Sequence, residues 1–93
     1  MGEGASHRQA RDAVAAYHHT ALSDLAQHVV DAADEFRAGT LDVTSFDRVI
    51  HQYHRATQEL WTFCNVGNPI VTADLIDRGV PIDWWERGAP KRA

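Results

Sequence analysis

The sequence of 93 residues has little of several features that whole classes of protein need. Cys64 is the single cysteine, so no disulfide can form within the chain, which suits a reducing compartment such as the cytoplasm. No apolar run approaches the roughly 20 residues that cross a bilayer, and residues 1–16 lack the apolar core of a secretory signal. We therefore expect one small cytoplasmic domain with no membrane partner.

Lysine is also scarce, since Lys91 is the only one and arginine supplies the other basic residues. Thirteen acidic residues outweigh nine basic ones, which gives a net charge of -4. A protein that coats nucleic acid or anionic lipid is normally basic, so the charge argues against either partner. The arginine bias, together with abundant alanine, valine and aspartate, is typical of a GC-rich bacterial genome.

The sequence is rich in helix-forming residues, and a first long helix is predicted over residues 6–38. This segment contains no glycine or proline, and Ser6 with Gln9 matches a capping box at its start. Gly39 follows it and is a typical helix-ending residue. Apolar residues recur along one face at helical spacing, so the segment should form a rod about 50 Å long.

A second helix is predicted over residues 44–64, with Thr44 as its N-cap. The connection between the two helices is short, so they should run antiparallel as a hairpin in which Phe36 meets Phe46. The first helix is the longer one. Residues 6–17 therefore need cover, either from the C-terminal segment or from a second copy of the chain.

The C-terminal residues 72–88 predict two short helices. Thr72 should cap the first, and the second should be a single turn around Trp84 and Trp85. Residues 89–93 are predicted to be a frayed tail. The sequence thus predicts one all-α domain over the whole chain, a long antiparallel helical hairpin followed by two short helices.

A second apolar surface, which we call the apolar flank, runs along the predicted hairpin beside its shared core. Its alanines allow another helix to approach closely, and its tryptophan is a typical interface anchor. Either Trp84 and Trp85 cover this flank within one chain, or a second copy covers it and completes a four-helix bundle as a homodimer. The small core of a two-helix hairpin favours the homodimer. The apolar flank consists of Ala15, Ala26, Val30, Ala33, Ile50, His54 and Trp61.

The other flank of the first helix is polar and is the candidate site for a divalent metal, the one cofactor that the sequence suggests. Imidazole and carboxylate groups spaced along one helix edge are suitable ligands. The Glu-x-x-His pair of di-iron bundles is absent, however, and such a row is more often a solvated face. The candidate ligands are Asp24, His28, Asp31 and Glu35.

Two further sets of histidines are candidates for chemistry. Asp47, His51 and His54 lie on the outer side of the second helix, a weak metal-binding pattern without a third strong ligand. His18 lies near the centre of the apolar face at the level of Cys64, but catalysis by such a pair would need an oxyanion pocket and an orienting acid. A core histidine is the usual interpretation, and its protonation as pH falls would make assembly pH-sensitive.

No strong catalytic motif is present, so the first hypothesis is a non-catalytic, homo-oligomeric helical module for protein–protein interaction, assembly or regulation. The alternative is a small metal-binding or redox bundle that uses the row of histidine and carboxylates. A further alternative is a DNA-associated regulator that contacts DNA through Arg8 and Arg11, with binding that weakens steeply as salt rises.

Overall fold

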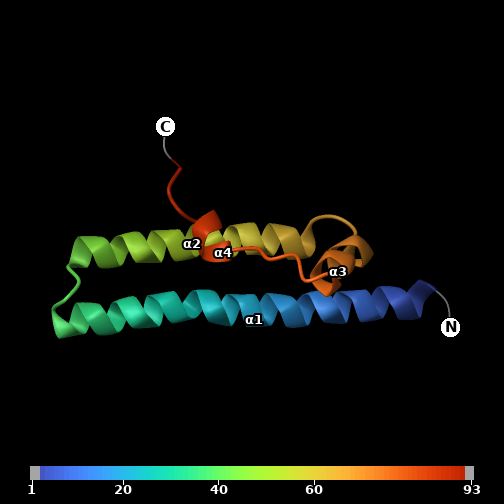
Figure 1. The fold of residues 1–93 in the computed structure, drawn as a ribbon, viewed down its shortest axis with the longest axis horizontal. Helices are drawn as coiled ribbons and strands as arrows, with labels where there is room; N and C mark the ends of the chain where they lie inside the picture. The colour runs from blue at the N-terminus through green and yellow to red at the C-terminus, as the bar shows by residue number, and fades with distance from the viewer. Residues whose placement is uncertain (1–2, 92–93) are drawn as a thin grey trace.

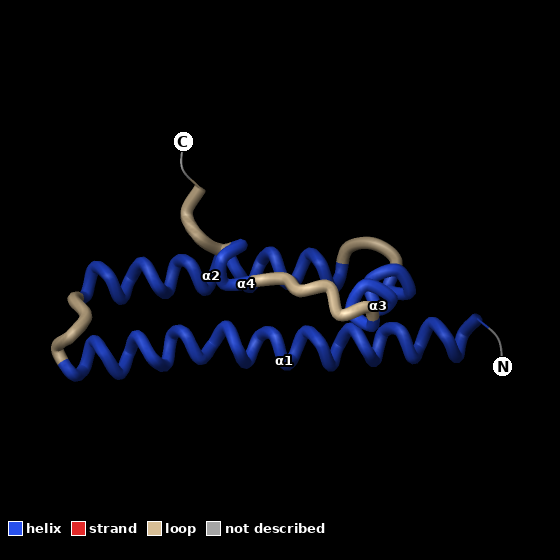
Figure 2. The backbone as a smooth tube through the Cα atoms, in the orientation of Figure 1, coloured by secondary structure: helices blue, strands red, loops and turns tan. Residues whose placement is uncertain are grey.

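The computed structural model describes residues 3–91, with side chains from Ser6 onward, and it confirms the all-α prediction. This part of the chain contains four helices and no strand (Figures 1 and 2). It measures 57 × 30 × 18 Å. The helices are α1 (Glu3–Ala38), α2 (Val43–Asn65), α3 (Pro69–Asp77) and α4 (Trp84–Arg87).

The long helix α1 begins earlier than the sequence indicates. Since α1 already includes Glu3, Ser6 lies within the helix and the predicted capping box there is wrong. The predicted end is confirmed: Gly39 has a φ of 83°, and Thr40 N donates to the carbonyl of Glu35 at 2.9 Å. A glycine in the left-handed conformation lets the chain turn out of the helix without a steric penalty.

The N-cap of α2 is Asp42 rather than the predicted Thr44. Its carboxylate oxygen Oδ1 accepts a hydrogen bond from the backbone N–H of Ser45 at 2.8 Å. That bond lowers the pKa of the Asp42 carboxyl below its ordinary value, because it stabilises the charged form. Aspartate and threonine are both good N-caps, so the sequence alone did not decide between the two positions.

The N-cap of α3 is also corrected, from Thr72 to Asn68. Asn68 is the N-cap, and its side-chain oxygen accepts from the backbone N–H of Ile70 at 2.9 Å. Proline lacks a backbone N–H, but the first residue of a helix has no intrahelical use for one. Pro69 therefore starts the helix, and Thr72 lies one turn inside it with its side chain buried.

The helices α1 and α2 lie side by side and point in opposite directions (Figure 1). Near their connection, the rings of Phe36 and Phe46 stack with centroids 5.3 Å apart, which confirms that predicted contact. At the other end, α3 lies against the N-terminal part of α1, where Ala10 and Val14 are buried (Figure 1). The overhang of α1 is therefore covered by the C-terminal segment of the same chain.

The core lies between α1, α2 and α4. Its fully or nearly fully buried side chains are Leu25, Ala56, Leu60 and Trp84, and further half-buried apolar residues pack around them. No helix within residues 3–91 is both long enough and apolar enough to cross a membrane.

Candidate functional site

The single turn α4 is fixed on α2 by two hydrogen bonds and one close backbone contact. Gln52 Nε2 donates to the carbonyl of Trp85 at 2.9 Å, and Arg55 Nε donates to the carbonyl of Gly88 at 2.7 Å. Gly88 is buried, and a Cβ built on it would lie 2.6 Å from the backbone nitrogen of Ala56. Only glycine allows α4 to approach α2 this closely, so it sets where the two tryptophans lie.

Trp84 is a core residue whose indole N–H forms a hydrogen bond. Its Nε1 donates to the hydroxyl of Tyr17 on α1 at 2.7 Å, and its ring contacts that of Phe63 on α2 at 5.2 Å between centroids. Arg87 lies over the same indole, 5.4 Å from the ring centroid. Trp84 thus joins α4 to both long helices.

Trp85 covers part of the polar flank of α1. Its ring stacks on that of His28 with centroids 4.1 Å apart and an angle of 1° between the planes. The side chain of Trp85 is half-buried by this contact. Both tryptophans therefore pack on the side of the helical pair that carries Tyr17 and His28.

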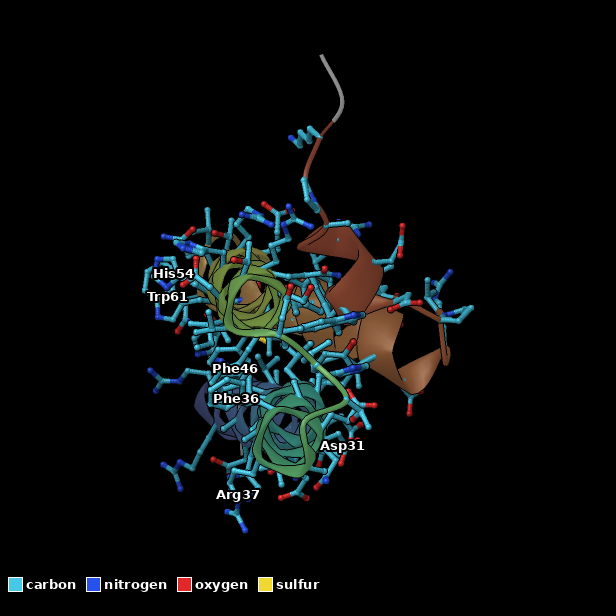
Figure 3. All side chains as sticks on the ribbon, turned by 90° about the vertical axis from the view of Figure 1, so that its left-hand side faces the viewer. Asp31, Phe36, Arg37, Phe46, His54 and Trp61 are labelled. Atoms are coloured by element: carbon cyan, nitrogen blue, oxygen red, sulfur yellow. The ribbon has the colours of Figure 1, made fainter. Side chains whose placement is uncertain are left out.

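The apolar flank is on the opposite side and is left open. Figure 3 shows His54 and Trp61 on the side of α2 away from α4, whereas Asp31 points to the side on which α3 and α4 lie. Val30 is 51% exposed, Ile50 42% and Trp61 55%. Cover of this flank by Trp84 and Trp85 of the same chain, one of the two alternatives from the sequence, is therefore wrong for this structure.

A cleft of about 470 Å³ opens between α1 and the segment that joins α3 to α4. We call it the aromatic cleft, because Tyr17 and both tryptophans of α4 line it. One wall is made by Tyr17, Thr20, Ala21, Asp24, Leu25 and His28 of α1, and the other by residues 80–85.

The four candidate metal ligands do not come together at one point. Among residues 6–91, no group of three or more histidine, cysteine, aspartate and glutamate side chains is placed to hold a metal ion. Asp24 and His28 line the aromatic cleft, and Asp31 accepts a hydrogen bond from Gln27 Nε2 at 2.8 Å. Glu35 is exposed near the end of α1. The structure gives this row no metal-binding geometry.

His18 and Cys64 line a second cavity, of about 400 Å³, beside the start of α3. His7 and Arg11 line it too, and none of its described lining residues is acidic. Burial raises the pKa of the Cys64 thiol, so the thiol is protonated at neutral pH and is a weak nucleophile. Among residues 6–91, no orienting carboxylate lines this cavity beside the pair. The role of His18 in pH-sensitive assembly stays a prediction.

The remaining polar candidates lie on the surface. His51 Nε2 is 3.3 Å from the Asp47 carboxylate one turn earlier in α2, and both side chains are 64% exposed, so this pair adds little stability. Arg8 and Arg11 are exposed near the start of α1, and the DNA-binding alternative stays a prediction.

Comparison with protein-family models, curated proteins and solved structures finds no match to this chain. The two surfaces that bear on its function are the apolar flank and the aromatic cleft.

Sequence reasoning missed the residues that dock α4, namely Gln52, Arg55 and Gly88. In the sequence, Gly88 looks like an ordinary helix-ending glycine, and both hydrogen-bonding side chains lie 33 positions away from the carbonyls they contact. A glycine just after a tryptophan-bearing turn is the one local signal of a close backbone approach.

Proposed function

We propose that this chain is a helical assembly module whose apolar flank pairs with the same flank of a second copy. The observation that carries the proposal is the exposure of Val30, Ile50 and Trp61 while the two other tryptophans of the chain pack on the far side. Large apolar side chains gathered on one open face are typical of protein–protein contact sites.

The dimensions of the flank suit a small dimer. From Ala15 to Ala33 it extends about 27 Å along α1, and two helices side by side make it about 20 Å wide. Each copy could then bury roughly 550 Å², or about 1,100 Å² in total, close to the lower limit of stable interfaces. The proposal therefore predicts a dimer that dissociates at micromolar concentrations rather than a permanent one.

Trp61 is the anchor of the proposed interface. With 55% of the residue exposed, about 140 Å² of its surface could be removed from water, which contributes at most about 3.5 kcal/mol per copy. Ala15, Ala26 and Ala33 on α1 are small enough to receive such a side chain from a neighbouring helix. A tryptophan against a row of alanines is a self-complementary arrangement, as a two-fold dimer requires.

Pairing of two such units would place α1 and α2 of both copies in one four-helix bundle. The dimer would bring two aromatic clefts to opposite outer sides of the bundle, since each cleft lies away from its own apolar flank. The chain would then act as an assembly or regulatory subunit rather than as a catalyst. A single, half-buried cysteine is compatible with the cytoplasm as its compartment.

Sedimentation equilibrium between about 1 µM and about 500 µM tests the proposal. The wild-type chain should shift from monomer to dimer over this range, and Trp61→Lys should remain monomeric, because pairing would bury the new charge. Ala16→Lys is the matched control: Ala16 is exposed on the outward face of α1, two residues after the buried Val14. Its dimer should be unchanged.

Circular dichroism should show the same helix content in all three proteins, since both substituted side chains are exposed. A wild-type chain that stays monomeric at the highest concentration would overturn the proposal. A control that dissociates the dimer as strongly as Trp61→Lys would show that a different surface is used.

A further inference from the structure

The aromatic cleft has the size and construction of a small-molecule site. Its volume of about 470 Å³ lies within the range of ligand pockets, roughly 300–1,000 Å³. Leu25, Ala21 and Ile82 give it apolar surface, while Asp24 and Asp83 supply polar groups. The cleft is built by the docking of α4 and does not depend on a second copy.

The lining of the cleft is mainly acidic, with one imidazole, that of His28, beside the carboxylates. Two carboxylates line it, and no lysine or arginine does. The Asp83 carboxylate accepts from the backbone N–H of Glu86 at 3.1 Å and so caps α4. The salt bridges formed among residues 6–91 are His51–Asp47 and Arg78–Asp74, so Asp24 keeps its carboxylate free of one.

The aromatic rings add to the attraction for a cation. The faces of indole and phenol rings carry partial negative charge and attract ammonium and guanidinium groups. Trp84 already has the guanidinium of Arg87 over its ring, 5.4 Å from the centroid. A ligand in the cleft would meet the half-buried rings of Tyr17 and Trp85 together with the carboxylate of Asp24.

We propose that the aromatic cleft binds a small organic cation, an amine or guanidinium carried on an apolar body. The cationic group would lie near Asp24, and the apolar body would fill the space between Leu25 and Ile82. An anionic ligand would meet two carboxylates with no lysine or arginine beside them and is disfavoured. The proposal is independent of the apolar flank, which is on the other side of α1 and α2.

Isothermal titration with 2-phenylethylamine tests the proposal, because this probe combines one ammonium group with one apolar ring. Its uncharged and anionic counterparts, 2-phenylethanol and phenylacetate, have nearly the same size. The amine should bind saturably, and the alcohol should bind at least about threefold more weakly, as expected for the loss of one exposed charge pair. Phenylacetate should show no binding.

Asp24→Asn removes the charge without changing the shape of the cleft and should weaken amine binding about three- to fivefold. Asp34→Asn is the matched control, since Asp34 is exposed on α1 and does not line the cleft. It removes the same net charge and should leave the affinity unchanged.

Three results would overturn the proposal: no saturable binding of the amine, equal binding of the amine and the alcohol, or equal weakening by both aspartate variants. The last result would mean that the amine responds only to the net negative charge of the chain. None of these readouts depends on dimer formation, so failure here and failure of the assembly proposal can be told apart.

Discussion

The substitution Gly88→Ala tests the docking of α4 most directly. The added Cβ would lie 2.5 Å from the carbonyl oxygen of Gln52 and 2.7 Å from the Cβ of Ala56. Ordinary contacts begin near 3.4 Å, so α4 would have to retreat by about 0.9 Å. The backbone of Gly88, with φ -86° and ψ -3°, is accessible to alanine, so the expected damage comes from crowding alone.

A retreat of that size breaks the contacts that hold α4. The hydrogen bond from Gln52 to the Trp85 carbonyl would lengthen from 2.9 Å to about 3.8 Å, and that from Arg55 to Gly88 from 2.7 Å to about 3.6 Å. Two lost hydrogen bonds, one with a charged donor, cost about 2–4 kcal/mol together. For a domain of this length, that lowers Tm by at least about 8 °C.

Urea unfolding followed by circular dichroism and by tryptophan fluorescence measures this loss. Gly67→Ala is the matched control: Gly67 has a φ of 104° and open space around it, so it should cost only the roughly 1–2 kcal/mol of a left-handed alanine. Ala56→Gly should not rescue Gly88→Ala, because a backbone oxygen and a backbone nitrogen also crowd the new methyl group. A Gly88→Ala protein as stable as wild type, or more stable, would refute this account of α4.

Three further predictions concern single residues. Asp42→Asn should flatten the fall in Tm as the pH drops below about 4. The lowered pKa of Asp42 means that its cap stabilises the fold fully above the unfolded-state pKa and that this stabilisation is lost as pH falls through the folded-state pKa. The same dependence of Tm on acid pH in both proteins, measured by thermal melts, would contradict this. Tyr17→Phe should lower the free energy of unfolding in urea by about 1–3 kcal/mol, because the indole N–H of Trp84 loses its hydrogen-bond acceptor. An unchanged urea midpoint would show that water replaces the hydroxyl. Cys64 should react with iodoacetamide more slowly in the folded chain than in urea, because burial raises the pKa of its thiol. Equal reaction rates at the same pH would contradict the burial of this side chain.

The long helices could be predicted from the sequence because their signals are local. Helix α1 could be found because its segment contains no glycine or proline from Ser6 onward, and its C-terminal boundary because Gly39 follows it. The first residues of the helices were harder to predict, because neighbouring residues are equally suitable as N-cap. Asp42 and Thr44 can both cap α2, and Pro69 can either end one helix or begin the next.

The candidate sites were less predictable, because their contacts join distant parts of the chain. Tyr17 and Trp84 are 67 positions apart, and the stacking of Trp85 on His28 spans a similar separation. Helical spacing assigned His28 to a polar flank, which suggested metal ligands. Only the docked position of α4 shows that this flank is one wall of an aromatic cleft.

The position of α4 also separates the two proposed surfaces, and this separation can be tested with Gly88→Ala. Loosening α4 should weaken binding of 2-phenylethylamine, because Trp84 and Trp85 form part of the cleft wall. The monomer–dimer equilibrium should change little, since α4 contributes no residue to the apolar flank and Trp61 lies on the other side of α2. If the substitution instead abolished both amine binding and the dimer, the released tryptophans would be covering the apolar flank. The docking of α4 would then control assembly, and the two surfaces would not be independent.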